Sequence, residues 1–453
     1  MSPQRRPHVV IAGGGIAGVE TVLALRALAG ARVSIELLTP EPDLVMRPLA
    51  VAAPFGTADV TRYPLEAICR NQNVHLRREP LEYVDVARRR VETASGARVD
   101  FDMLVLAVGA RRRDALPGSL TFDGDAGIRG FRQILDDLRR GAARSLTFVV
   151  PDGVTWPLPL YELALMTAEH VRDDDVRLTL VTPEDDPLDV FGLPARERVR
   201  ALLAERNITL RVGARPLDVT NGILLTSDGA IPAARLVALP RLEGARVPGV
   251  PCDRDGFLDV DEHGEVVGAP GVYAAGDGTS QPVKQGGLAA QQADAAAEAI
   301  AAACGAPLTP TPFRPQLRAQ LLTGTLPWWF RAEAASTSPL WRPAGKVAAR
   351  YLTPYLTERA PLGLTDHPVL RDVDAPEREL IEERQAALDM ALTLADDEAA
   401  AGEPLLAIRW LEAAEGIAGT LPPEYVEKRR RWAQPTAPDA PRVREPGGAW
   451  SVR

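Results

Sequence analysis

The sequence has few of the residues that carry metal or thiol chemistry. Its 453 residues include three cysteines and five histidines, and neither type shows the short spacing of a metal site. Cys69, Cys252 and Cys304 have no near cysteine neighbour in the chain, as a close redox pair would. We therefore expect no metal site, and we interpret the three thiols as buried core residues of a protein from a reducing compartment.

Long apolar runs and excess positive charge are also absent. No stretch approaches the roughly twenty apolar residues that a membrane-spanning helix needs. The short apolar run after Arg5 and Arg6 breaks into three glycines, so it lacks the core of a signal peptide. A net charge of −9 does not favour nucleic acid as a partner. We expect a cytoplasmic protein that binds no nucleic acid, and a peripheral contact with the inner face of the membrane is the alternative.

The sequence does contain one clear nucleotide-binding pattern. Its length of 453 residues predicts about three domains, and its 46% apolar content is enough to give them buried cores. An apolar strand at 9–12 runs into a G-x-G-x-x-G turn, followed by an expected helix over 19–28 and a strand over 33–41. A pyrophosphate binds such a turn because the N–H groups of the helix N-terminus are bare and no Cβ blocks its approach. The turn consists of Gly13, Gly14, Gly15, Ile16, Ala17 and Gly18.

A second stretch repeats this unit without its glycines. Its loop contains Pro151, which has no N–H group, and Trp156, which adds bulk where a ligand would approach. The sequence therefore predicts two doubly wound α/β domains, of which only the first keeps a dinucleotide-binding turn. For the second copy we expect strands at 146–150, 176–184 and 236–241 and a helix through Tyr161 and Glu162, and for the first copy a last strand at 103–110.

A further motif lies downstream, where the segment 271–278 ends in Gly276-Asp277-Gly278 and a small-residue helix is expected over 286–303. These features resemble the flavin-binding signature of the pyridine nucleotide-disulfide oxidoreductase superfamily. The resemblance implies that FAD is the cofactor and that the second nucleotide domain is inserted in the FAD domain. Three unrelated glycine turns in an ordinary α/β protein are the alternative. The expected domains are 1–115 and 243–306 for FAD binding, 116–242 for the second domain, 307–435 for a C-terminal interface and helical domain, and 436–453 for a disordered tail.

The resemblance also assigns the FAD contacts. In the superfamily an acidic residue often follows the second strand and holds the adenosine ribose, and here either Thr39 or Glu41 could make that bond. Glu36 lies within the strand, where we expect a structural or solvent-facing role. Asp277 would reach the ribityl chain of FAD. Besides the glycine turn, the expected cofactor contacts are Thr39, Glu41, Arg47, Pro48, Ala107, Val108, Gly109, Gly276, Asp277, Lys284 and Gln285.

Lys284 is the candidate for an electrostatic role in catalysis. It shortly precedes the helix over 286–303, whose N-terminus faces the pyrimidine edge of the flavin in the resembled family. A positive charge and a helix dipole at that edge would favour the anionic reduced flavin. A solvated lysine on a loop is the alternative.

Within the superfamily the chain resembles the sulfide:quinone oxidoreductase and type II NADH dehydrogenase branch over residues 8–357. The sequence lacks one feature that each of these two activities requires. An NADH dehydrogenase should keep the second glycine loop, and a sulfide oxidase should place cysteines near the second helix and in the C-terminal region. The resemblance therefore supports the flavin better than its electron donor. The segments that carry it are 46–49, 102–110, 282–287 and 340–346.

The C-terminal part changes in composition. Four prolines between 307 and 315 mark a domain edge. Aromatic residues beside Arg and Lys at 326–331 and 346–352 suit a homodimer interface, a lid over the flavin, a membrane surface or a plain core. Apolar residues at helical spacing over 378–432, broken at 402–404, predict a helical hairpin that packs on the flavin domains. The hairpin resembles a single tetratricopeptide unit.

These observations lead us to expect an FAD-dependent oxidoreductase that passes electrons from an unidentified donor to an acceptor. A quinone is the acceptor that the family resemblance implies. Two alternatives stay open. One is an NAD(P)H dehydrogenase that uses a reshaped second domain, and the other is a flavin-containing interaction protein with little turnover.

Overall fold

The fold comes from a computed structural model, and the chain divides into two compact units. The first unit comprises Met1–Ser336 and Trp341–Leu370, and the second comprises Thr337–Leu340 and Arg371–Arg453. The structure describes residues 5–172, 175–324, 328–331, 346–359, 388, 392–393, 395–396, 399–400, 407–408, 410–411, 414–415 and 421–432. The predicted tail at 436–453 and most of the segment 340–346 lie outside these residues.

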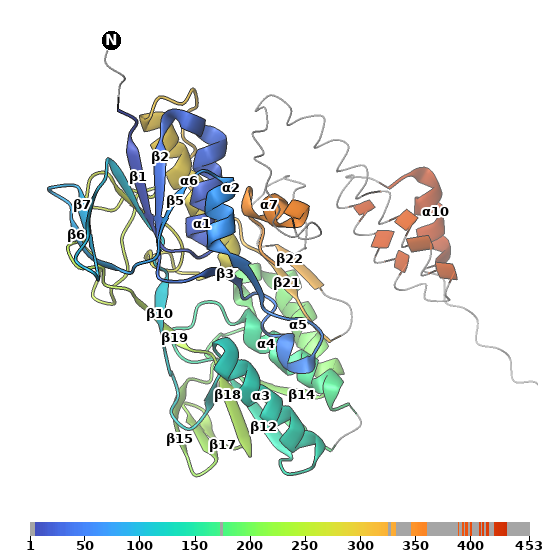
Figure 1. The fold of residues 1–453 in the computed structure, drawn as a ribbon. Coiled ribbons are helices and arrows are strands. Elements are labelled where there is room, and N and C mark those ends of the chain that lie inside the picture. Colours follow the sequence, from blue (N-terminus) through green and yellow to red (C-terminus); the bar gives the residue numbers. More distant parts are fainter. Residues whose placement is uncertain are drawn as a thin grey trace, which may run out of the picture. The chain divides into compact units, whose positions relative to one another are not determined.

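The first sheet of the first unit has the strand order β20-β9-β1-β2-β5, and every neighbouring pair is parallel. Such sheets are buried on both faces, which is why β1 reads as a continuous apolar run. Helix α1 packs along α6 and is buried from Ala17 to Leu25, so it too is apolar on nearly all sides (Figure 1). The elements are β1 (His8–Ala12), α1 (Ile16–Leu28), β2 (Ser34–Leu38), β5 (His75–Arg77), β9 (Met103–Leu106), β20 (Val272–Ala274) and α6 (Gly286–Ala303).

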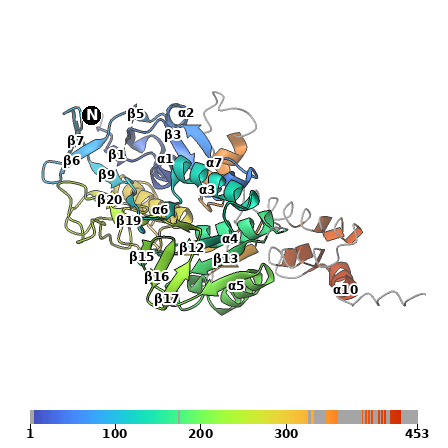
Figure 2. The same ribbon diagram turned by 90° about the horizontal axis from the view of Figure 1, so that it is seen from below.

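The second sheet repeats this order as β11-β18-β12-β13-β14, again parallel throughout. Strands β18, β12, β13 and β14 correspond in order to β9, β1, β2 and β5, so the duplication predicted from the sequence is confirmed in the topology. The surrounding helices are seen from below in Figure 2. The elements are β11 (Leu120–Thr121), α3 (Gly124–Arg139), β12 (Ser145–Val149), α4 (Leu158–His170), β13 (Arg177–Val181), α5 (Leu193–Glu205), β14 (Ile208–Arg211) and β18 (Arg235–Ala238).

An antiparallel ribbon carries the chain into the second sheet and back. It pairs β10 (Ala110–Arg113) with β19 (Arg241–Gly244), and it lies between the two doubly wound parts in Figure 1. Strand β20 then adds to the first sheet beside β9. The first sheet is therefore built from chain on both sides of the second, as expected for an inserted domain.

Smaller elements complete the described part of the chain. Those that border the two sheets are η1 (Gly30–Arg32), β3 (Asp43–Met46), η2 (Ala53–Phe55), β4 (Thr61–Pro64), α2 (Leu65–Asn71), β6 (Leu81–Asp85), β7 (Arg90–Thr93), β8 (Arg98–Asp100), η3 (Asp189–Phe191), β15 (Pro216–Thr220), β16 (Ile223–Thr226), β17 (Gly229–Pro232), β21 (Arg318–Leu321), β22 (Trp328–Arg331) and α7 (Leu352–Arg359). In the second unit α10 (Pro423–Trp432) is described, and the apolar cluster contains Leu392, Ala395, Leu411, Ala414 and Leu421.

Several sequence expectations need correction or stay untested. Cys69 is buried as expected, but Cys252 is exposed and Cys304 is half-exposed, so the interpretation of all three as core residues was wrong. Helix α1 begins at Ile16 rather than at 19, because Gly15 already serves as its N-cap. Among the described residues, no helix is both long enough and apolar enough to cross a bilayer. The domain boundaries and the helical hairpin stay predictions.

Candidate functional site

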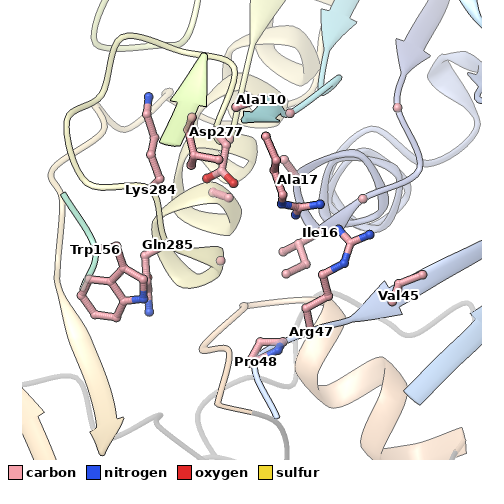
Figure 3. A pocket seen from close by; sticks show the side chains of 18 of the residues that line it. Ile16, Ala17, Val45, Arg47, Pro48, Ala110, Trp156, Asp277, Lys284 and Gln285 are labelled. Atoms are coloured by element: carbon pink, nitrogen blue, oxygen red, sulfur yellow. The ribbon is translucent and has the colours of Figure 1, made fainter. Parts of the chain in front are cut away.

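A cavity of about 970 Å³ lies at the carboxyl ends of the first sheet's strands, and residues of the second domain between 153 and 162 line part of it. Ligands of doubly wound domains bind at this edge. All of the predicted cofactor contacts except Gly18 line the cavity. Figure 3 shows Ile16, Ala17, Arg47 and Asp277 around one space, although they come from separate parts of the chain.

The turn between β1 and α1 is held by backbone contacts. Gly13 has a φ of +118°, and a Cβ there would lie 2.1 Å from the carbonyl oxygen of Ala107. A Cβ on Gly18 would lie 1.9 Å from the carbonyl oxygen of Gly13. Gly18 is therefore needed for packing, which explains why it does not line the cavity. Gly15 differs, because a Cβ there would have no protein atom within 4 Å.

The open side of Gly15 is where an anion would approach α1. The first helical hydrogen bond runs from the N–H of Val19 to the carbonyl of Gly15, at 3.0 Å. No side chain caps the helix, and its first turn holds no acidic residue. The earlier N–H groups of the helix are thus left for a ligand, and they carry the positive end of the helix dipole. A pyrophosphate fits this position.

The turn after β2 leaves one carboxylate open to the cavity. Thr39 is buried, and its Oγ1 accepts a hydrogen bond from the N–H of Glu41 at 3.3 Å. The carboxylate of Glu41 is exposed and has no partner among the described residues. Of the two candidates for the ribose, Glu41 is the one whose side chain is free to accept its hydroxyl groups. Glu36 is buried and bonds Arg77 at 2.5 Å, so its structural role is observed.

The second domain carries the same turn in a closed form. Residues 182–184 repeat Thr-Pro-Glu, and the N–H of Glu184 donates to Thr182 Oγ1 at 3.2 Å. Here the carboxylate is already used, because it accepts from the hydroxyl groups of Tyr161 at 2.6 Å and Thr182 at 2.8 Å. Burial raises the pKa of Glu184. The ribose position of this copy is therefore filled by protein.

The loop before α4 is also unlike a nucleotide-binding turn. Eight residues separate β12 from α4, whereas three separate β1 from α1. Pro157 and Pro159 remove N–H groups at the start of α4, and Leu160 donates its own to Pro157 at 2.9 Å. The Thr155 hydroxyl bonds the carbonyl of Pro282 at 2.5 Å, and Trp156 lines the cavity. The loop has become a wall of the first domain's cavity.

Arg47 and Asp277 line the cavity without a hydrogen-bond partner in the part of the chain that the structure describes. Arg47 has no hydrogen-bond acceptor among the described residues, and burial together with the like charge of Arg112 lowers its pKa. Asp277 has no hydrogen-bond donor there either, and its burial raises its pKa against the attraction of Lys284. FAD supplies an anionic pyrophosphate and a ribityl chain of hydroxyl groups. The residues present therefore fit this cofactor.

Lys284 and Gln285 are both held by protein. The Nζ of Lys284 donates to the carbonyl of Thr279 at 2.5 Å and lies 4.1 Å from the ring centre of Phe257. Burial lowers the pKa of Lys284 to about 8, although Asp277 opposes the shift. The side chain is therefore not a solvated loop lysine. Gln285 caps α6 by accepting from the N–H of Leu288 at 2.9 Å.

A buried ion pair in the same cavity was not predicted from the sequence. Glu162 of α4 accepts hydrogen bonds from Lys346 Nζ and from the N–H of Leu322, the latter at 2.8 Å. Both charged side chains are at most 5% exposed. Burial raises the pKa of Glu162, and Lys346 opposes the shift. One signal could have drawn attention to the pair. The sequence holds three lysines, and two of them, Lys284 and Lys346, line this cavity.

Comparisons with known proteins agree with this geometry. Residues 7–300 match the family described as pyridine nucleotide-disulphide oxidoreductase. An NADH dehydrogenase-like protein of Mycobacterium tuberculosis is 29% identical over 60% of this chain and 72% of its own length. The ferredoxin reductase component of a chlorobenzene dioxygenase from a Cupriavidus strain is 30% identical over 62% and 69%. The sulfide:quinone oxidoreductase structure from Aquifex aeolicus shares the fold, with a TM-score of 0.67 and 21% identity over 72% of this chain and 84% of that one.

The open face of Gly15 leads to a test of where the cofactor binds. We expect wild-type protein to be yellow with about one FAD per chain, and Gly15→Val to be folded but colourless, because the new side chain would occupy the pyrophosphate position without touching protein. The visible absorbance per chain measures this. Gly18→Ala is the contrast, since its Cβ meets backbone and should lower stability by about 1–3 kcal/mol. Full flavin occupancy in Gly15→Val would show that the placement is wrong.

The position of Lys284 leads to a second test. We expect Lys284→Met to lower the flavin midpoint potential at pH 7 by on the order of 30 mV, equivalent to about 1.4 kcal/mol, with unchanged FAD content. The lysine is charged below its pKa of about 8, so the difference from wild type should shrink as the pH rises above that value. A spectroelectrochemical titration at several pH values measures it. Lys428→Met, in the second unit, is the control. Equal potentials at pH 7 would remove Lys284 from the site.

Proposed function

We propose that this chain passes an electron pair from a small donor to a quinone. The premise is that it belongs to the pyridine nucleotide-disulphide oxidoreductase family and is an FAD-dependent oxidoreductase. FAD, when bound, accepts and releases that pair. The observation that carries the proposal is the cavity wall, where Glu162 of the second domain forms a buried ion pair with Lys346.

The donor side of the proposal rests on the closed second domain. Its glutamate at the ribose position is bonded to Tyr161, and prolines take the place of donors at the start of α4. NADH and NADPH therefore lack the contacts by which such a domain holds them. Sulfide is also a poor candidate, because none of the three cysteines lines the cavity. Burial moreover raises the pKa of Cys69 to about 12 and that of Cys304 as well, which disfavours thiolates.

The acceptor side rests on Glu162 and Lys346. A quinone that becomes a quinol takes up two electrons and two protons, so its site needs proton donors. Glu162, a buried carboxyl group of raised pKa, and the Lys346 ammonium group lie together in the wall of the cavity. Trp156, Leu158 and Pro159 from the same domain give the wall an apolar surface on which a flat ring can pack.

The donor is tested by anaerobic reduction of the holoprotein. We expect NADH and NADPH to bleach the flavin far more slowly than dithionite does, because Glu184 is bonded to Tyr161 and the loop before α4 lacks the glycine turn. Stopped-flow absorbance measures the rates. Rapid stoichiometric reduction by micromolar NADH would contradict the proposal and favour an NAD(P)H dehydrogenase. Reduced protein that no quinone reoxidises would favour an interaction protein with little turnover.

The acceptor is tested by mixing reduced protein with a short-chain quinone. We expect Glu162→Gln to slow reoxidation by the quinone about tenfold or more, because the Glu162–Lys346 pair that would deliver the proton is broken. Reoxidation by ferricyanide, which takes electrons without protons, should not change. Glu169→Gln is the matched control, since Glu169 lies on the same helix but does not line the cavity. Equal slowing with both oxidants would argue against a proton-donating role.

A further inference from the structure

The segment at 346–352, here called the strap, crosses the start of α6 and leads into α7. It packs closely there, because a Cβ on Gly286 would lie 3.3 Å from Val347 and one on Gly287 would lie 3.5 Å from the carbonyl oxygen of Ala348. Val347, Ala349 and Leu352 are buried. Lys346 begins the strap with a φ of +58°. The strap thus carries Lys346 into the cavity over two glycines that leave room for it.

One buried carboxylate fastens the far end of the strap to α1. Glu20 is 0% exposed, and it accepts hydrogen bonds from the N–H groups of Tyr351 at 2.8 Å and Leu352 at 2.6 Å. Leu352 is the first residue of α7, and the N–H groups at the start of a helix have no carbonyl acceptor within that helix. A carboxylate at this position also interacts favourably with the helix dipole.

The surroundings of Glu20 explain how a carboxylate is kept there. Asp294 of α6 faces it, and burial together with the charge of Glu20 raises the pKa of Asp294. Burial also raises the pKa of Glu20, while the strap N–H groups and Asp294 oppose that shift. Asp294 therefore keeps its proton more readily and can donate it to Glu20. The other charged and titratable groups that face the pair are Glu298, Arg350 and Tyr351, and Arg350 bonds Glu298 at 3.1 Å.

We propose that Glu20 is a positioning residue, which fastens the strap to α1 and so keeps Lys346 beside Glu162 in the cavity. The bonds from Thr353 Oγ1 to the carbonyl of Val347 and from the N–H of Ala349 to Thr353 join the strap to the start of α7. Arg350 bonds Glu298 of α6, so the strap is also held to that helix by one ion pair. The two bonds to Glu20 reach α1. The importance of Lys346 for turnover rests on the proposed function, whereas the anchoring itself does not.

The proposal can be tested by chemical labelling of lysine, because the sequence contains three lysines that can be followed separately. An amine-reactive reagent applied to the FAD-bound protein can modify three lysine side chains, Lys284, Lys346 and Lys428, and mass spectrometry resolves them. In wild type we expect Lys346 to react slowest, because its side chain is 5% exposed. In Glu20→Gln, where an NH₂ group would face a strap N–H, we expect Lys346 to react at least tenfold faster. Lys284 and Lys428 should react as before.

Two variants serve as controls. Thr21→Val changes a neighbouring, equally buried residue of α1 whose hydroxyl donates to the carbonyl of Ala17 within the helix, and it should leave Lys346 protected. Glu20→Asp keeps a carboxylate and should restore part of the protection. A folded, FAD-bound Glu20→Gln protein with Lys346 as slow as in wild type would overturn the proposal.

A measurement on wild type keeps the proposal testable if Glu20→Gln does not fold. Hydrogen exchange of the strap should then be slow at Tyr351 and Leu352, the two residues whose N–H groups bond Glu20. Exchange there at the rate of an unstructured peptide would overturn the anchor. Faster labelling of Lys346 in Glu20→Gln, combined with unchanged quinone reoxidation in Glu162→Gln, would support the anchor while contradicting the quinone proposal.

Discussion

The backbone contact between Gly13 and Gly18 fixes the site, because it sets how closely α1 approaches the turn that precedes it. No side chain fits between these two glycines, and none fits between Gly13 and the backbone of Ala107. The backbone after β9, the glycine turn and the start of α1 are therefore in direct van der Waals contact. Helix α6 then packs on α1 through small residues such as Ala289 and Ala293. These closely packed segments line the cavity and so set its shape on this side.

The two doubly wound domains show how one supersecondary unit can serve two purposes. Both keep the Thr-Pro-Glu turn, and in both the threonine hydroxyl accepts from the glutamate N–H. In the first copy the carboxylate of Glu41 faces the cavity, and in the second the carboxylate of Glu184 accepts a hydrogen bond from the Tyr161 hydroxyl. The second domain has thus lost the features of a nucleotide site while it supplies Trp156 and Glu162 to the cavity of the first.

Local patterns made the fold and the first nucleotide turn predictable from the sequence. An apolar strand, a glycine turn and a helix follow one another directly at β1 and α1, and the parallel order of both sheets confirmed the inference. The Glu162–Lys346 pair joins residues 184 positions apart, and the bond from Leu352 to Glu20 spans 332 positions. Such contacts leave no periodic signal in the sequence. The exposure of Cys252 was missed because a single residue type says little about burial at one position.

The choice between lysine and arginine has a consequence for how the molecule handles protons. Three of its 52 lysine and arginine residues are lysines, and guanidinium groups stay charged at every pH at which a protein is folded. Most of the positive charge is therefore permanent. Among the lysines, Lys284 and Lys346 stand at the cavity, and Lys428 pairs with Asp396 in the second unit. Burial lowers the pKa of Lys284 to about 8, so its positive charge at the cavity changes with pH in a range where an arginine charge does not.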